Sequence, residues 1–177
     1  VRLLEARGKE FWKQGDKQEA IKAFEKVLDS KINPNSKRLQ WVRLWALKQT
    51  PELSDFIRNF LERTIPIPAA VIQLNSLIGK FPEEVTLPYL LARQLHNSKA
   101  YDEAIEFLAP SLNHPNPEIA AESLRLIAEA YWNKNDPENA RAFYERYKRQ
   151  APTTGEAARA QMWIERIRWK FRTNKRD

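Results

Sequence analysis

The chain has 177 residues, of which 42% are hydrophobic and 11% aromatic, so it can bury a substantial core, and global disorder is excluded. It contains no cysteine, which excludes disulfides, thiol catalysis and cysteine-ligated metal sites. Its formal net charge is +7, and residues 141–177, with eleven Lys or Arg and four Asp or Glu, account for all of it. The basic character therefore belongs to the C-terminal end.

No apolar run approaches the roughly 18 residues that a membrane span requires, so no transmembrane segment is predicted. No signal peptide is recognised either. The first residue is Val rather than Met, and we expect this chain to be a processed or excised piece of a longer protein.

An alanine followed four residues later by a large apolar residue recurs along the chain. The last three of these alanines are spaced 34 and 36 residues apart, which is typical of a helix–turn–helix repeat. Two helices cross closely only where one side chain is very small, and the large residue fills the next hole on the same face. The pairs are Ala20 with Phe24, Ala70 with Leu74, Ala104 with Leu108, and Ala140 with Tyr144.

The first repeat is predicted over about 1–34. Gly15 is expected to end its first helix and Asp16 to cap its second. The segment resembles a tetratricopeptide repeat, whose pattern is a small residue, an aromatic, a Gly-Asp turn, an alanine, an aromatic and a closing proline. The matching residues here are Gly8, Phe11, Gly15, Asp16, Ala20, Phe24 and Pro34.

Residues 35–50 do not follow that pattern. They are apolar on more than one face, which is typical of a helix buried on two sides, and we interpret them as one extra helix. An alternative is that this helix pairs with residues 51–63, which would leave 69–81 unpaired.

Three more repeats are predicted over about 51–84, 85–117 and 121–154, followed by a capping helix over 154–172. The last repeat has the best match, with Ala128, Tyr131, Asp136, Ala140 and Tyr144 in the expected places. The resemblance implies an all-α fold, a right-handed α-solenoid of about four helix pairs, and we expect residues 1–177 to form one domain.

The sequence gives little support for a catalytic function. The two histidines, His96 and His114, are more simply interpreted as exposed structural residues than as catalytic or metal-binding ones. No phosphate-binding glycine loop or metal-binding motif is present. We expect no enzymatic activity, no metal and no cofactor.

In the family that the chain resembles, the first helices of the repeats line a concave groove that binds a protein or peptide partner. The places that would line it here hold Lys9, Trp12, Lys13, Tyr89, Arg93, His96, Arg125, Glu129 and Trp132. Trp12 and Trp132 occupy the same place in their repeats, and each has two interpretations, a groove anchor or packing against a neighbouring repeat. The groove places do not reproduce the Lys, Asn and Arg set with which one subfamily binds the carboxylates of chaperone tails, so an adaptor of that kind is not expected.

The basic end is a second candidate surface, because basic residues interleaved with aromatics suit phosphate contact and base stacking. The face is formed by Arg159, Arg166, Arg168, Lys170 and Arg172. We expect a protein-interaction scaffold that binds a partner segment in its groove, in a bacterial setting by general resemblance. The alternative is a nucleic-acid-binding helical repeat that uses the basic face, and a docking domain of a larger enzyme also stays open.

Overall fold

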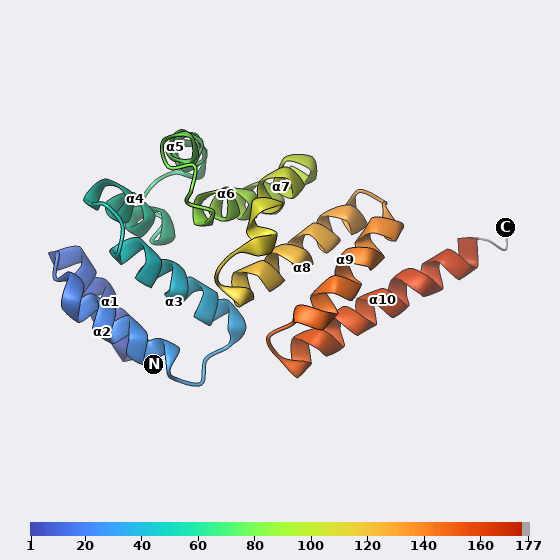
Figure 1. Cartoon of the computed structure of the whole chain (residues 1–177), viewed down its shortest axis with the longest axis horizontal. Helices are drawn as coiled ribbons and strands as arrows, with labels where there is room; N and C mark the ends of the chain where they lie inside the picture. The colour runs from blue at the N-terminus through green and yellow to red at the C-terminus, as the bar shows by residue number, and fades with distance from the viewer. Residues whose placement is uncertain (175–177) are drawn as a thin grey trace. The chain divides into compact units, whose positions relative to one another are not determined.

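The computed structural model describes residues 1–174, and side chains through residue 170. In this part of the chain α-helices follow one another with no strand, so the predicted all-α helical-repeat fold is confirmed (Figure 1). The helices are α1 (Arg2–Gln14), α2 (Lys17–Leu28), α3 (Pro34–Leu47), α4 (Pro51–Leu61), α5 (Ile67–Lys80), α6 (Thr86–Asn97), α7 (Tyr101–Leu108), the 3-10 helix η1 (Pro110–Asn113), α8 (Pro117–Asn133), α9 (Pro137–Gln150) and α10 (Thr154–Asn174).

The helices group into two compact units, residues 1–70 and residues 71–177, and the single domain stays a prediction. Helix α5 begins in the first unit and ends in the second. The units are called unit 1 and unit 2 below, and each is described by itself.

The turns within the helix pairs follow local signals in the sequence. Gly15 ends α1 in the left-handed conformation at φ 84°, and the carboxylate of Asp16 then caps α2 by accepting a hydrogen bond from the Glu19 amide. Between α8 and α9, Asn135 takes the left-handed conformation at φ 57° and Asp136 caps α9. The predicted roles of Gly15 and Asp16 are therefore confirmed.

The first small residue of the pattern lies where α1 and α2 cross. Gly8 is buried, and a Cβ atom added to it would lie 2.7 Å from the Cε1 atom of Phe24, whose side chain is fully buried. A ring enclosed in a packed core cannot retreat without disturbing its neighbours. Glycine at this position is what allows α1 and α2 to approach closely.

We expect Gly8→Ala to lower the free energy of unfolding by about 1 kcal/mol, because the cost of overpacking exceeds the gain in helix propensity. The matched control is Gly79→Ala in α5, where an added Cβ meets nothing within 4 Å. That change should raise stability by roughly 0.5–1 kcal/mol. Urea denaturation followed by circular dichroism compares the two, and stabilisation by both changes would contradict the close packing of Gly8 on Phe24.

In unit 1 successive helices pack on one another: α1 on α2, α2 on α3 and α3 on α4. Buried positions of α3 point in several directions and include Gln40, Val42, Arg43 and Leu44, as expected for a helix buried on more than one side. Its contacts with α4 are those that the alternative pairing requires, in which residues 35–50 pair with 51–63. We propose that α3 and α4 form a helix pair; the repeat bounds stay a prediction.

In unit 2 the packing order is α6 on α7, α7 on α8, α8 on α9 and α9 on α10. The repeat residues Ala104, Leu108, Ala140 and Tyr144 are all buried. The core around α8, α9 and α10 is formed by Ala121, Leu124, Ala128, Ala140, Tyr144, Tyr147, Ala160, Ile164 and Ile167. Since α10 has 21 residues and α9 has 14, the two cannot pair along the full length of α10, and its C-terminal part extends past α9 (Figure 1).

Candidate functional site

The predicted groove residues of unit 1 lie in different surroundings. Lys13 is exposed, and Lys9 is half-buried with its ammonium 3.4 Å from a carboxylate oxygen of Glu5. Trp12, by contrast, is only 3% exposed.

Trp12 is a core residue, which corrects its placement among the groove residues. Its ring packs edge-on against Phe24 at a centroid distance of 6.2 Å, and its indole Nε1 donates a hydrogen bond to Ser54 Oγ at 3.2 Å. Ser54 lies on α4, as does Arg58, whose guanidinium donates to the backbone oxygen of Trp12. Of the two interpretations of this tryptophan, packing against neighbouring helices is the one observed.

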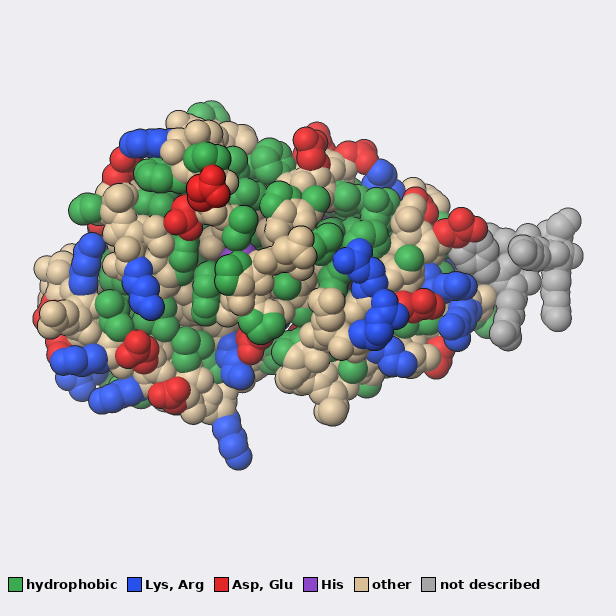
Figure 2. Space-filling model, viewed as in Figure 1, with side chains coloured by type: hydrophobic (Ala, Val, Ile, Leu, Met, Phe, Trp, Pro, Cys, Tyr) green, Lys and Arg blue, Asp and Glu red, His purple; other side chains and the backbone are tan. Residues whose placement is uncertain are grey.

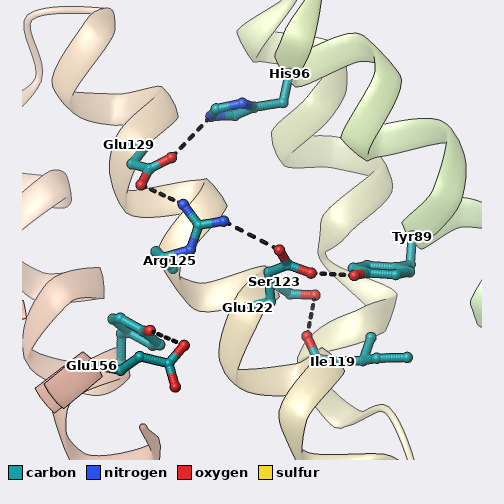
Figure 3. A network of polar contacts seen from close by, with 9 residues as sticks. Tyr89, His96, Ile119, Glu122, Ser123, Arg125, Glu129 and Glu156 are labelled. Atoms are coloured by element: carbon teal, nitrogen blue, oxygen red, sulfur yellow. Dashed lines mark hydrogen bonds and ion pairs between the residues drawn. The ribbon is translucent and has the colours of Figure 1, made fainter. Parts of the chain in front are cut away.

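Tyr89 is also corrected. The sequence analysis placed it in the groove, but its side chain is fully buried on α6. Its hydroxyl donates a hydrogen bond to Glu122 of α8, which is itself only 3% exposed (Figure 3). The side chain is turned toward the neighbouring helix, so it is not available to a partner.

Helices α6 and α8 are joined by a polar network centred on Arg125 (Figure 3). Its guanidinium lies 3.2 Å from Glu122 and 2.5 Å from Glu129, and Glu129 lies 3.8 Å from the His96 ring nitrogen Nε2. Burial opposes the charge of Arg125, but the two carboxylates raise its pKa above the usual value. The positive charge of Arg125 is therefore compensated by the carboxylates of this network.

His96 is half-buried and packs edge-on against Tyr101. Burial lowers its pKa below the usual value, opposed by Glu129 and reinforced by Arg125. At neutral pH the imidazole is therefore predominantly uncharged, and it contributes a polar edge to this surface rather than a positive charge.

Trp132, the counterpart of Trp12, lies half-buried at the junction of α8 and α10. Its ring packs against Trp163 at 5.7 Å, and Trp163 stacks in parallel on the buried Tyr144 at 5.6 Å. Two cations of α10 lie against the indoles: Arg166 at 5.0 Å from the Trp163 ring and 5.9 Å from Trp132, and Lys170 at 4.7 Å from Trp132. We call Trp132, Trp163, Arg166 and Lys170 the cation–aromatic cluster.

Helical spacing places these residues in rows. On α10, Arg159, Trp163, Arg166 and Lys170 recur at i, i+4, i+7 and i+11 and so lie along one side of the helix. On α8 the same spacing joins Arg125, Glu129 and Trp132, and contacts between side chains connect the rows of α6, α8 and α10. We call this surface the α6–α8–α10 face; it comprises Arg93, His96, Arg125, Glu129, Trp132, Trp163, Arg166 and Lys170.

The predicted basic face is divided by the structure. Arg159, Arg166, Arg168 and Lys170 are all exposed, and Figure 2 shows Lys and Arg side chains gathered over α9 and α10. Arg166 and Lys170 belong to the cation–aromatic cluster, whereas Arg168 is directed toward Glu145 of α9 at 3.8 Å. Arg172 lies outside the described side chains.

Two contributors were missed in the sequence analysis. Neither Trp163 nor Glu122 was named among the candidate site residues. The i, i+4, i+7 spacing of aromatic and basic residues along 159–170 was the available signal for Trp163. No comparable signal marks Glu122, because its role depends on Tyr89, which is 33 residues away in the sequence.

His114 is buried at 5% exposure, which corrects its expected exposed position. Its Nδ1 accepts a hydrogen bond from the Asn116 amide, so Nε2 carries the proton and donates to Thr86 Oγ1 at 3.1 Å. Burial lowers its pKa to about 4.

Among the side chains described through residue 170, no group of His, Asp or Glu is arranged to hold a metal ion. Nor does any helix in that part combine the length and apolarity needed to cross a membrane.

Comparison with protein families decides the family. A tetratricopeptide repeat model matches residues 5–71 and 113–153. The chain belongs to the tetratricopeptide repeat family. Among curated proteins nothing matches it. Tetratricopeptide repeats generally mediate protein–protein interaction and act as non-catalytic scaffolds. The match includes the α8 row, while Arg93, His96 and the whole of α10 lie outside it.

Proposed function

We propose that this tetratricopeptide repeat chain is a scaffold without catalytic activity that binds an extended or helical segment of a protein partner along the α6–α8–α10 face. The observation that carries the proposal is Trp132, which is half-buried between two helices at the edge of the core and has two cations beside it. Lys9 and Lys13 are proposed as a further contact set on unit 1.

The physical support comes from the way interfaces gain affinity. Trp and Arg are the residues that most often dominate binding energy, and a half-buried indole can still remove apolar surface from water when a partner covers it. The network of Arg125, Glu122 and Glu129 is already formed, so binding beside it costs little additional side-chain entropy.

The experiment that tests the proposal is site-specific photocrosslinking. A benzoylphenylalanine replaces Arg93 on the α6–α8–α10 face, and a matched chain carries it at Glu138, an exposed position of α9. Both chains are irradiated in extract of the source cells after nuclease treatment. We expect a discrete protein adduct from position 93 that is absent from position 138; adducts of equal yield and identity from both, or none from position 93, would contradict binding along this face.

A second candidate is nucleic-acid binding by the basic face, favoured by Trp169, which is 69% exposed between the exposed Arg168 and Lys170. Binding of this kind weakens steeply as salt rises, because it releases counterions. It would be abolished by reversing the charges of Arg166, Arg168 and Lys170. Affinity for an oligonucleotide that is insensitive to salt would contradict it.

A further inference from the structure

We propose that the cation–aromatic cluster is a carboxylate-binding subsite and that the segment it receives is acidic. This inference rests on the proposed function and names the chemistry of the partner. It also assigns a recognition role to α10, a helix that lies outside the tetratricopeptide repeat match.

The first observation concerns the charge of Arg166. Arg166 and Lys170 are four residues apart on α10, a spacing at which like charges destabilise a helix. Among the described residues Arg166 forms no ion pair with a carboxylate; its contacts are the indoles of Trp132 and Trp163. An incoming carboxylate would relieve the repulsion and supply the missing partner.

The nearby carboxylates of unit 2 are already engaged. Glu122 and Glu129 bind Arg125, and Glu145 lies between Arg141 and Arg168. Glu165 accepts a hydrogen bond from Gln161. In the proposal, the acid that completes the cluster comes from another molecule.

The geometry suits a carboxylate. A guanidinium that lies over an aromatic ring still has N–H groups in its own plane, which can donate two parallel hydrogen bonds to one carboxylate. The apolar indoles beside the two cations exclude water on one side, which strengthens the attraction relative to an open surface. Lys170, 4.7 Å from the Trp132 ring, provides a second positive charge beside the same indole.

The row on α10 also indicates a spacing for the acids. Arg159 precedes Arg166 by seven residues, about 10 Å along a helix. In an extended chain of polyproline II type, residues three apart lie on the same side and about 9 Å from each other. Two acidic side chains three residues apart could therefore contact Arg159 and Arg166 together.

Charge complementarity selects this occupant. The basic end carries the whole net charge of +7 and would attract an acidic segment from solution. A nucleic acid would need free aromatic faces for its bases to stack on. Trp163 has Tyr144 stacked parallel to it and Arg166 against its ring, and Trp132 is flanked by both cations. The cluster therefore offers ion pairing rather than stacking.

The test uses the full chain and a synthetic fluorescein-labelled peptide with glutamate at every third position. Fluorescence anisotropy measures Kd for this peptide and for the same peptide with glutamine in place of glutamate. We expect the glutamine peptide to bind at least about tenfold more weakly to the unmodified chain. Equal affinity for the two peptides would overturn the proposal without any variant.

The variant arm compares two double substitutions that remove the same charge. Arg166→Gln with Lys170→Gln removes the cluster cations, and Arg149→Gln with Arg168→Gln removes two exposed cations elsewhere on α9 and α10. We expect a loss of affinity of at least about tenfold for the first and less than about threefold for the second, with thermal midpoints that agree within a few degrees. Equal losses of affinity in the two double variants would show that the peptide is attracted by the overall positive charge, and would overturn the subsite.

A single-stranded oligonucleotide of the same charge as the peptide is the competing probe. If this oligonucleotide binds more tightly than the peptide, and if that binding is lost in the Arg166→Gln, Lys170→Gln chain, the ligand is a nucleic acid and the acidic protein segment is overturned.

The crosslinking at position 93 separates this inference from the proposed function. If position 93 gives an adduct and the cluster variants do not change the affinity for the peptide, the proposed scaffold function is supported and the carboxylate-binding subsite is rejected. Peptide binding that depends on the cluster, without any adduct at position 93, would support the subsite and reject the wider binding face.

Discussion

Replacing Trp12 by alanine is expected to lower the free energy of unfolding by about 3–5 kcal/mol. The side chain is 3% exposed and packs on Phe24, so its removal leaves a cavity in unit 1. It also removes the indole donor of Ser54 Oγ, whose own side chain is 1% exposed. Guanidinium chloride denaturation followed by circular dichroism measures the change.

The matched control for Trp12 is its neighbour Lys13, which is exposed on the same helix. Lys13→Ala should change the free energy of unfolding by no more than about 0.5 kcal/mol. If the Trp12→Ala chain were as stable as the Lys13→Ala chain, the core position of Trp12 would be contradicted and Trp12 would again be a candidate for partner binding.

Replacing Arg125 by methionine is expected to lower the free energy of unfolding by about 3 kcal/mol. The change removes the guanidinium that lies 3.2 Å from Glu122, a carboxylate that is only 3% exposed. Methionine replaces the apolar stem of arginine but lacks the guanidinium, so most of the loss reports the missing charge. Thermal and urea unfolding at neutral pH measure the effect.

Two further chains make the Arg125 result specific. Arg93→Met on α6 removes a cation that lies over the Tyr89 ring at 5.7 Å without an ion pair among the described residues, and it should cost less than about 1 kcal/mol. Adding Glu122→Gln to Arg125→Met should restore most of the lost stability, because the buried carboxylate that Arg125 compensates is then removed as well. No recovery in the double variant would mean that Arg125 stabilises the fold through packing alone.

The Arg125 result also bears on recognition. The sequence analysis assigned Arg125 and Glu129 to partner binding, and both lie on the α6–α8–α10 face. Their mutual ion pair and the contact of Glu129 with His96 connect α6 to α8. A loss of partner affinity in an Arg125 variant should therefore be interpreted together with its stability, whereas the exposed Arg166 and Lys170 can be changed with less effect on the fold.

Features that depend on neighbours in the sequence could be predicted. The Gly15-Asp16 turn was predicted because a left-handed residue and a capping carboxylate act over one helical turn. The recurring alanines were predicted to lie where helices cross, and Ala20, Ala70, Ala104 and Ala140 are indeed buried. The 34- and 36-residue spacing of these alanines predicted helix–turn–helix repeats, and the described part of the chain consists of successive helices without a strand.

The two tryptophans at the same place of their repeats show where such prediction ends. The amino-acid sequence by itself determined the all-α repeat fold, the turns and the small residues at helix crossings, because these depend on interactions within one or two helical turns. Only the tertiary structure decided that Trp12 is a core residue and that Trp132 is half-buried at the edge of the core. Trp12 meets Ser54, which is 42 residues away, whereas Trp132 meets Trp163, Arg166 and Lys170 of the last helix. The surroundings of a side chain on a repeat are set by whichever helix packs next to it, and that neighbour is specified by the packing of the whole unit rather than by the residue's own position in the pattern.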